Sequence, residues 1–345
     1  MDNNSIRVSI IVPVHNNPQD LRKCLSALTA PSDAESEVIV VDDASTDDTP
    51  AVAARMGVRV LRLAQNSGPA AARNHGARLA QGEILFFVDA DVVVAPGAVG
   101  RVAKAFEEHP DVAAIFGSYD AFPRARGVVS QYRNLMHHFV HQHGNPDAST
   151  FWAGCGAIRR SVFQAMEGFD EKRFPRPSIE DIELGYRLRQ AGHRILLDKT
   201  LQATHLKRWT LRSVIRTDVT CRAIPSSRLI LERKHAPDDL NLKKAQRVSV
   251  ALAALASVLL PFALFRVELL RLSAAALLGV LILNRELYAF FFRQRGLLFA
   301  SACVPLHLLY YLCGGFSYLY VRIGFPPKAA AKTRPSLSQA NRAIP

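Results

Sequence analysis

The run Phe87-Val88-Asp89-Ala90-Asp91 is an apolar, strand-like stretch that ends in two carboxylates one residue apart. Because side chains alternate along a strand, Asp89 and Asp91 are expected on the same side, with Ala90 turned away. Carboxylates at a strand end suit Mg²⁺ or Mn²⁺, which complete their coordination shells with water and phosphate oxygens. The run therefore favours chemistry on a diphosphate, although an isolated Asp-x-Asp is also typical of a solvated turn.

The residues around this run alternate between apolar stretches and helical patterns. Strands are expected at 8–12, 37–41, 58–63 and 84–88, and helices at 18–28, 46–56 and 69–81. Strands that alternate with helices are joined by right-handed crossovers and form a parallel sheet. The expected fold class is therefore α/β, with a Rossmann-like, mostly parallel sheet flanked by helices.

Polar residues follow the ends of these strands. They are His15 and Asn16, Asp42 and Asp43, Asn66, and Asp89 with Asp91. Ligands of parallel sheets sit at the carboxyl ends of the strands. Four separate strand ends thus predict one site along one edge of the sheet.

The apolar residues of this 345-residue chain are concentrated in its last third. The stretches 248–265 and 297–321 carry no Asp, Glu, Lys or Arg, and each is long enough to cross a hydrocarbon core of ~30 Å. The stretch 267–284 is a poorer candidate, because Glu268 and Arg271 lie in its first turns. Buried core helices are the alternative, but such helices normally have a polar face. Two crossings, with a possible third, are expected.

Basic residues crowd the segment before the first apolar stretch. They are Lys207, Arg208, Arg212, Arg216, Arg222, Arg228, Arg233, Lys234, Lys243, Lys244 and Arg247, within a net charge of +13. Such a cluster keeps its side of the membrane cytosolic and attracts anionic lipid at ~1 kcal/mol per basic residue. A solvated linker is the alternative, and nucleic acid is not an expected partner. Since Met1 to Arg7 form no secretory signal, the N-terminal domain is expected in the cytosol.

Four spaced motifs together resemble the inverting family 2 glycosyltransferases with the GT-A fold. They are Ser9-Ile10-Ile11-Val12-Pro13-Val14-His15-Asn16, Val40 to Thr49 (Val-Val-Asp-Asp-Ala-Ser-Thr-Asp-Asp-Thr), Asn66 to Asn74 (Asn-Ser-Gly-Pro-Ala-Ala-Ala-Arg-Asn) and Asp89-Ala90-Asp91. The resemblance covers about residues 6 to 210. It implies transfer of a sugar from a nucleotide donor, assisted by Mg²⁺ or Mn²⁺.

The resemblance also implies roles for individual residues. The predicted nucleotide-binding residues are Pro13, His15, Asp43, Asn66, Arg73, Asn74 and Asp89; the predicted metal ligands are Asp91, Asp89 and His205. A bound cation would stabilise the negative charge that grows on the departing nucleoside diphosphate.

The pair Glu180-Asp181 opens a predicted amphipathic helix, where anions are favoured. Acidic residues at a first helical turn are also ordinary caps. In similar enzymes the aspartate of this pair is the general base, so Asp181, with Glu180 beside it, is predicted to be catalytic.

Between these sites, residues 152–157 (Trp-Ala-Gly-Cys-Gly-Ala) resemble the acceptor-side segment of the family, although Trp152 could equally be core. Cys155 is not expected to be a nucleophile, because no paired base lies nearby and inversion needs no covalent intermediate. In the Gln-x-x-Arg-Trp signature of processive members, His205 stands where glutamine would be. A single transfer is therefore favoured over polymerisation.

The full expectation is a GT-A domain over 1–235, a basic juxtamembrane linker over 236–247, membrane helices within 248–321 and a disordered tail over 322–345. The enzyme would act at the cytosolic face of the plasma membrane, on a lipid or lipid-linked acceptor of cell-envelope glycan synthesis. The alternatives are an inactive nucleotide-sugar-binding membrane protein and, less favoured, a nucleotidyltransferase. The donor sugar, its nucleobase and the side on which the tail lies stay open.

Overall fold

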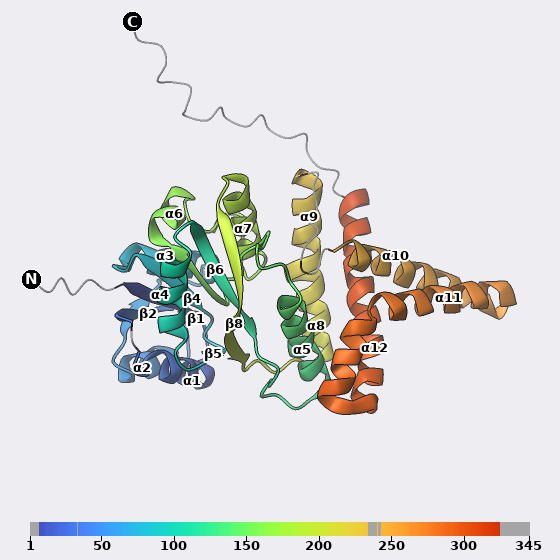
Figure 1. The fold of residues 1–345 in the computed structure, drawn as a ribbon, viewed down its shortest axis with the longest axis horizontal. Coiled ribbons are helices and arrows are strands. Elements are labelled where there is room, and N and C mark those ends of the chain that lie inside the picture. The colour runs from blue at the N-terminus through green and yellow to red at the C-terminus, as the bar shows by residue number, and fades with distance from the viewer. Residues whose placement is uncertain (1–6, 33, 234–239, 241–242, 325–345) are drawn as a thin grey trace, which may run out of the picture.

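The structure is a computed structural model that describes residues 7–32, 34–233, 240 and 243–324. The predicted tail from 325 onward and much of the predicted linker lie outside the described residues. Figure 1 shows a sheet domain on one side of a wall of helices, with a helical hairpin projecting from the other side.

The sheet domain is built on eight strands in the order β3-β2-β1-β4-β7-β6-β8-β5. The strands are β1 (Val8–Val14), β2 (Ser36–Asp42), β3 (Arg59–Arg62), β4 (Ile84–Val88), β5 (Val92–Val94), β6 (Val112–Tyr119), β7 (Cys155–Arg159) and β8 (Arg194–His205). The four strands β3, β2, β1 and β4 are mutually parallel, as the alternating pattern predicts.

Beyond β4 the sheet is mixed, because β7 runs antiparallel to both β4 and β6. Because β7 is antiparallel to both of its neighbours, β6 points the same way as β4. The strand β8 pairs parallel with β6 and therefore has this direction too. The last residue of β8, His205, therefore reaches the same edge as the first four strand ends. The short strand β5 then pairs antiparallel with β8 and places Val92 opposite His205.

Helices cover both faces of the sheet. They are α1 (Pro18–Leu28), α2 (Thr49–Arg55), α3 (Gly68–Leu79), α4 (Ala98–Glu108), α6 (Arg160–Ala165) and α7 (Glu180–Gln190). Alternation along β1 divides the core: Ile10 packs in the cluster that includes α1 and α4, and Ile11 packs in the cluster that includes α3 and α7. Both clusters are almost fully buried.

The helices of the wall and of the projecting hairpin follow β8, apart from α5. They are α5 (Val128–Gln142), α8 (Leu211–Arg216), the π-helix η1 (Thr217–Ala223), α9 (Ile224–Arg233), α10 (Lys244–Leu259), the 3₁₀-helix η3 (Leu260–Leu264), α11 (Val267–Leu283) and α12 (Arg285–Gly324). A third core cluster, with Tyr132, Leu135 and Phe291 fully buried, joins α5 to α12.

Two segments are long and apolar enough to cross a membrane by length and composition, Lys244–Ala263 and Arg285–Gly324. Only 17% and 28% of their most apolar windows are buried within the described structure. The helix α12 is bent at Gly296, where φ is 80°. The first segment contains residues 248–263 of the predicted stretch 248–265, and the second contains the predicted stretch 297–321; the stretch 267–284 corresponds to the shorter α11.

Candidate active site

One cavity of about 2000 Å³ opens at the carboxyl edge of the sheet and extends toward the helical wall. It is lined by nearly all the predicted site residues: Pro13, His15, Asp43, Asn66, Arg73, Asp89, Asp91, Glu180, Asp181 and His205. Segments separated by up to 192 positions thus contribute to one site, as the common edge of the strands requires.

Asp91 and His205 form the best candidate metal pair in the cavity. Pairing of β5 with β8 brings the Asp91 Oδ2 atom within 3.5 Å of the His205 Nε2 atom. Burial is the largest single influence and raises the pKa of the Asp91 carboxyl, but His205, Lys207 and a backbone hydrogen bond together outweigh it and lower the pKa. Within the described residues, no group of three or more His, Cys, Asp or Glu side chains could hold a metal alone.

This two-residue set fits Mg²⁺ or Mn²⁺ in a diphosphate site, since such ions take one or two protein ligands and draw the rest from phosphate and water. A residue that the sequence analysis missed, Asn134, orients the histidine. Its Oδ1 atom lies 2.8 Å from His205 Nδ1, and both residues are buried. With Nδ1 donating to Asn134, Nε2 is the ring nitrogen that faces Asp91, where loss of its proton would present a lone pair to a metal ion.

The ring of Tyr119 stacks on His205 with 4.5 Å between ring centres. The sequence did carry a signal for this wall of the site: Asn134, His137 and His141 recur at helical spacing on α5, and both histidines line the cavity. Burial lowers the pKa of His137 well below its ordinary value, so His137 is neutral. The stripe formed by Asn134, His137 and His141 therefore faces the part of the cavity that Asp91 and His205 line.

Arg73 joins the donor and acceptor halves of the site. Its guanidinium donates to Asp89 Oδ1 at 2.6 Å and to Glu180 Oε1 at 2.9 Å, and Arg73 itself is 5% exposed. One buried cation thus compensates two carboxylates from elements far apart in sequence. Asp89 is therefore engaged by an arginine, whereas Asp91 faces a histidine.

Asp181 lies in the first turn of α7, beside Glu180. Its oxygens accept hydrogen bonds from the backbone N–H groups of Ala153 at 3.1 Å and Ile182 at 2.8 Å. Burial first, and then the neighbouring carboxylate of Glu180, raise the pKa of Asp181 to about 7 in spite of Arg73 and these hydrogen bonds. A carboxylate with such a pKa, facing a cavity, can accept a proton near neutral pH.

Close packing fixes α7 in this position. A Cβ atom on Gly185 would lie 2.3 Å from the backbone nitrogen of Phe151, so only glycine allows α7 to approach the segment before β7 so closely. That segment supplies the Ala153 N–H that binds Asp181.

Asp43 holds the start of α3. Its two carboxylate oxygens accept from the backbone N–H groups of Ser67 at 2.7 Å and Gly68 at 2.8 Å. Its backbone oxygen lies 2.8 Å from His15 Nδ1 and 3.4 Å from Asn66 Nδ2. Asp43 therefore organises the nucleotide side of the cavity as well as lining it.

Asn74 is the one predicted site residue that the structure does not bring into the cavity. Its side chain accepts from the Phe169 N–H at 2.9 Å and donates to the Phe169 carbonyl and to Glu171, each at 2.8 Å. Its observed contacts fasten the 169–171 turn to α3, next to Arg73. A direct role at the nucleotide stays a prediction.

Trp152 lines the cavity and packs edge-on against Tyr119, with 4.8 Å between ring centres. Gly154 lies directly against the indole, where a Cβ atom would come within 2.7 Å. The adjacent Cys155 is fully buried, and burial raises the pKa of its thiol. This environment agrees with the expectation that Cys155 is not a nucleophile.

Away from the carboxylates, the same cavity continues between the wall and the hairpin. Its apolar lining there includes Val250, Ala254, Phe316 and Leu319 from α10 and α12. Basic side chains of η1 and its neighbours, Arg216 and Arg222 among them, line the passage between the two parts.

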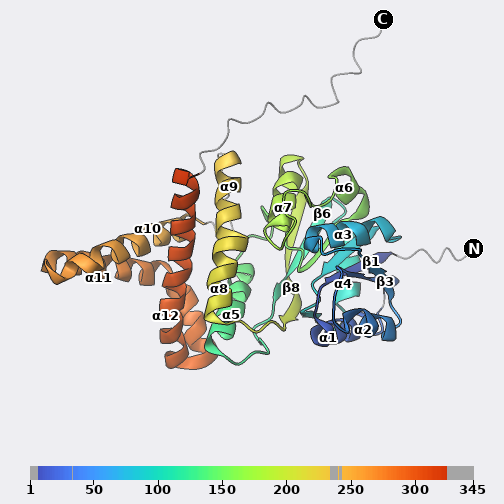
Figure 2. The same ribbon diagram turned by 180° about the vertical axis from the view of Figure 1, so that it is seen from behind.

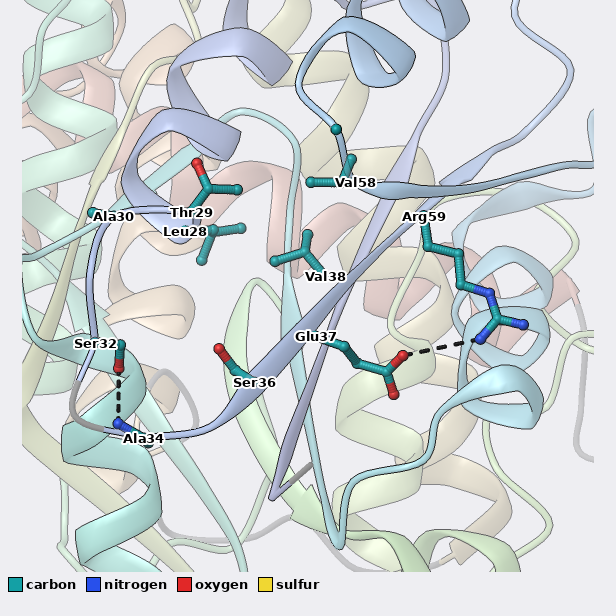
Figure 3. Close-up of a pocket in the computed structure, with 11 residues that line it drawn as sticks. Leu28, Thr29, Ala30, Ser32, Ala34, Ser36, Glu37, Val38, Val58 and Arg59 are labelled. Atoms are coloured by element: carbon teal, nitrogen blue, oxygen red, sulfur yellow. Dashed lines mark hydrogen bonds and ion pairs between the residues drawn. The ribbon is translucent and has the colours of Figure 1, made fainter. Parts of the chain in front are cut away.

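A second pocket, of about 460 Å³, lies at the amino end of β2 and is shown in Figure 3. Its one carboxylate, Glu37, is already engaged by Ser9 at 2.6 Å and by Arg59 at 3.9 Å. The other residues that line it are small, aliphatic or hydroxylic. Its lining offers no catalytic constellation.

Comparison with known proteins places this geometry in context. Residues 9–166 match the family described as Glycosyl transferase family 2. The chain is 30% identical over 221 residues to Pre-mycofactocin glycosyltransferase of Mycobacterium tuberculosis, covering 60% of the chain and 44% of that relative. It is 34% identical over 119 residues to Uncharacterized glycosyltransferase YibD of Escherichia coli, covering 33% and 34%. The chain therefore aligns with less than half the length of these relatives.

Solved structures share the fold. The mannosyltransferase PcManGT from Pyrobaculum calidifontis, in complex with GDP-Man and Mn²⁺, superposes with a TM-score of 0.54 at 19% identity, covering 91% of this chain and 87% of that one. Residues 1–349 of TarS from S. aureus superpose with a TM-score of 0.50 at 21% identity, covering 92% of both chains. The sheet domain thus has the architecture of GT-A-like glycosyltransferases.

Proposed function

This chain carries a glycosyl transferase family 2 domain, and on that premise we propose that it transfers one sugar, with inversion, from a nucleoside-diphosphate sugar to an acceptor at the cytosolic face of a membrane. The observation that carries the proposal is the convergence of Asp89, Asp91 and Asp181 on one cavity. A site for the sugar donor and a general base for the acceptor hydroxyl therefore lie in the same cavity.

In this mechanism Asp181 accepts the proton of the acceptor hydroxyl. The acceptor oxygen forms a bond to the anomeric carbon as the carbon–oxygen bond to the diphosphate breaks, and the diphosphate leaves with the bonding electrons. A divalent cation held by Asp91 and His205 would supply electrostatic stabilisation of that leaving group. Arg73 keeps Asp89 in place beside it.

The acceptor is proposed to be a lipid or a lipid-linked glycan. Support comes from the continuity of the cavity, which runs from Asp181 past Arg216 and Arg222 to the apolar side chains of α10 and α12. Within the described residues, no carboxylate forms an ion pair with Arg216 or Arg222. An anionic phosphate linker next to the sugar acceptor, followed by a hydrocarbon chain, matches this order of surfaces.

The test is release of nucleoside diphosphate by the purified full chain from a panel of nucleotide sugars, with Mn²⁺ or Mg²⁺ and with or without a membrane lipid extract. We expect release with at least one donor, and stimulation by the lipid extract. No release from any donor would contradict the enzymatic proposal. Release that lipid leaves unchanged, but that a water-soluble glycan stimulates, would contradict only the lipid acceptor.

A further inference from the structure

The hairpin of α10, η3 and α11 is the most exposed apolar part of the molecule. Its large exposed apolar residues are Val248, Leu255, Val258, Leu260, Phe262, Phe265, Val267, Leu270, Leu272, Leu278, Leu281, Ile282 and Leu283. Figures 1 and 2 show the two helices side by side, projecting away from the sheet domain and the wall. A water-exposed surface of this size and composition is typical of a lipid or protein interface.

The dimensions of the hairpin match a bilayer. The uncharged stretch 248–265 has 18 residues, which at about 1.5 Å per residue span about 27 Å, close to the ~30 Å thickness of the hydrocarbon core. Charged residues return at the tip of the hairpin, where Arg266, Glu268 and Arg271 are exposed. The apolar belt is therefore bounded at the far end as well as at the base.

Polar groups mark the base. Asn284 is 4% exposed and donates to Ser249 Oγ at 3.0 Å, while the Tyr311 hydroxyl lies 2.5 Å from Gln246 Oε1 and 2.8 Å from Asn284 Oδ1. These hydrogen bonds tie both legs of the hairpin to α12. They also satisfy the polar groups that would otherwise be costly near hydrocarbon.

The charges distinguish the two ends of the hairpin. The base carries four basic residues and one acidic one, Lys243, Lys244, Arg247, Arg285 and Glu286, against the two arginines and one glutamate of the tip. An excess of Lys and Arg in short flanking segments keeps that end cytosolic. The base adjoins the wall, so the sheet domain lies on the cytosolic side.

The second half of α12, after Gly296, has a different orientation. Both views show it running along the wall, across the direction of the hairpin. One face is buried, with Cys303, His307 and Tyr311 at helical spacing. Phe316, Leu319, Tyr320 and Ile323 form an exposed stripe at the i, i+3, i+4, i+7 spacing. A helix packed on one side and apolar on the other suits the plane of a membrane surface.

We propose that only the α10–α11 hairpin crosses the bilayer, and that α12 after Gly296 lies along the cytosolic surface of the membrane. This inference rests on the membrane association in the proposed function, and it specifies which helices cross the bilayer. Two crossings return the chain to its starting side, so the end of α12 at Gly324 is cytosolic. Composition alone ranks the candidate membrane-spanning segments differently: it makes 297–321 a firm crossing and 267–284 a poor one.

The test uses a membrane-impermeant maleimide on intact cells and on inverted membrane vesicles. Single cysteines replace Lys104 in the sheet domain, Glu268 at the hairpin tip, Arg293 just before the bend of α12 and Arg322 near the end of α12, all exposed. The unsubstituted chain reports the background from its own five cysteines. We expect labelling of K104C, R293C and R322C only in inverted vesicles, and of E268C only in intact cells.

Labelling of R293C from outside would show that 297–321 crosses in place of α11, and labelling of R322C from outside would show a third crossing. Either result would overturn the inference, as would labelling of all four cysteines on one side. Donor-dependent release of nucleoside diphosphate is measured in the same vesicles, so loss of the proposed activity is read separately from the topology.

A depth measurement avoids reliance on the tip cysteine. Tryptophan placed at Leu278 in the hairpin is expected to be quenched best by lipids brominated deep in the acyl chain, and tryptophan placed at Phe316 by lipids brominated near the headgroup. Equal depth for the two positions would overturn the inference. The chain has only two native tryptophans, so the background is small.

Discussion

Replacing Asp181 by asparagine removes the proposed base while keeping the size of the side chain. We expect the D181N variant to lose about 10²- to 10⁴-fold in kcat, the usual contribution of general acid–base catalysis. Donor affinity should stay unchanged, because Asp181 lies on the acceptor side of the Arg73 network. Nucleoside diphosphate release and donor titration calorimetry measure the two effects. Activity within a few-fold of the parent would refute the assignment.

The pKa of Asp181 sets a pH dependence. Because burial and Glu180 raise it to about 7, the carboxylate is ionised and able to accept a proton above that pH, and protonated below it. The kcat/KM for the acceptor should therefore fall about tenfold per pH unit below pH 7. An ordinary aspartate would place this fall near pH 4. A flat profile between pH 5 and 8 would contradict the prediction.

Asn134 is expected to act on the metal through His205. The variant N134L removes the acceptor for His205 Nδ1, so Mn²⁺ affinity should drop about 10- to 100-fold, as for other partners of metal-binding histidines. The variant N134D keeps an acceptor oxygen and serves as the control that retains affinity. Calorimetry or electron paramagnetic resonance of Mn²⁺ measures binding without turnover. Equal affinity in parent and N134L would exclude this positioning role.

The positions of individual residues could be predicted from sequence where the residues follow the end of a strand. Asp89 and Asp91 directly follow a strand whose observed bounds, Ile84–Val88, are the predicted ones. The contacts of Arg73 with Glu180 and of His205 with Asn134 join residues 107 and 71 positions apart. Such pairs depend on the tertiary packing of whole elements, which the periodicity of one chain does not encode.

At the level of elements, the position of α7 depends on a single glycine. In the G185A variant the added methyl group would meet the backbone of Phe151 at 2.3 Å and force α7 away from the segment before β7. We expect a loss of about 1–3 kcal/mol in the free energy of unfolding and a marked loss of activity. Thermal unfolding and nucleoside diphosphate release provide the measurements.

The matched control is G100A in α4, where a Cβ atom meets nothing within 4 Å. Replacing glycine by alanine inside a helix should raise stability there by up to about 1 kcal/mol. If both variants behave alike, the close approach of α7 is not the constraint described above.

The sequence predicted the parallel strands and their helices because each is a long periodic segment with its own turn signals. The reversed strand β7 was not foreseen, since Cys155–Arg159 is short and its pairing with both β4 and β6 depends on the sheet as a whole. The last part of β8, residues 198–205, was likewise not predicted. Only pairing with β6 and β5 keeps those residues extended.

For the whole molecule, the ion pair of Arg133 with Asp218 holds α5 against η1 within the helical wall. Both residues are 3% exposed, their closest atoms are 2.6 Å apart, and Arg133 also packs over Trp209 and Tyr310. In the R133M variant Asp218 loses its buried counter-ion. We expect a loss of about 3–5 kcal/mol in stability, measured by unfolding of the purified chain in detergent.

The double variant R133M/D218N removes both charges and should recover much of that loss. The surface pair Lys104–Glu108 provides the contrast, because K104M should change stability by less than about 1 kcal/mol. No recovery in the double variant would show that Arg133 acts by packing alone.

The cavity that opens both to Asp181 and to the apolar side chains of the hairpin has a consequence for how the two substrates meet. A donor dissolved in water reaches the site by diffusion in three dimensions, whereas an acceptor dissolved in lipid reaches it by diffusion in the two dimensions of the bilayer. Turnover then follows the number of acceptor molecules per unit of bilayer rather than per litre, so diluting the acceptor with inert lipid slows the enzyme at constant bulk concentration.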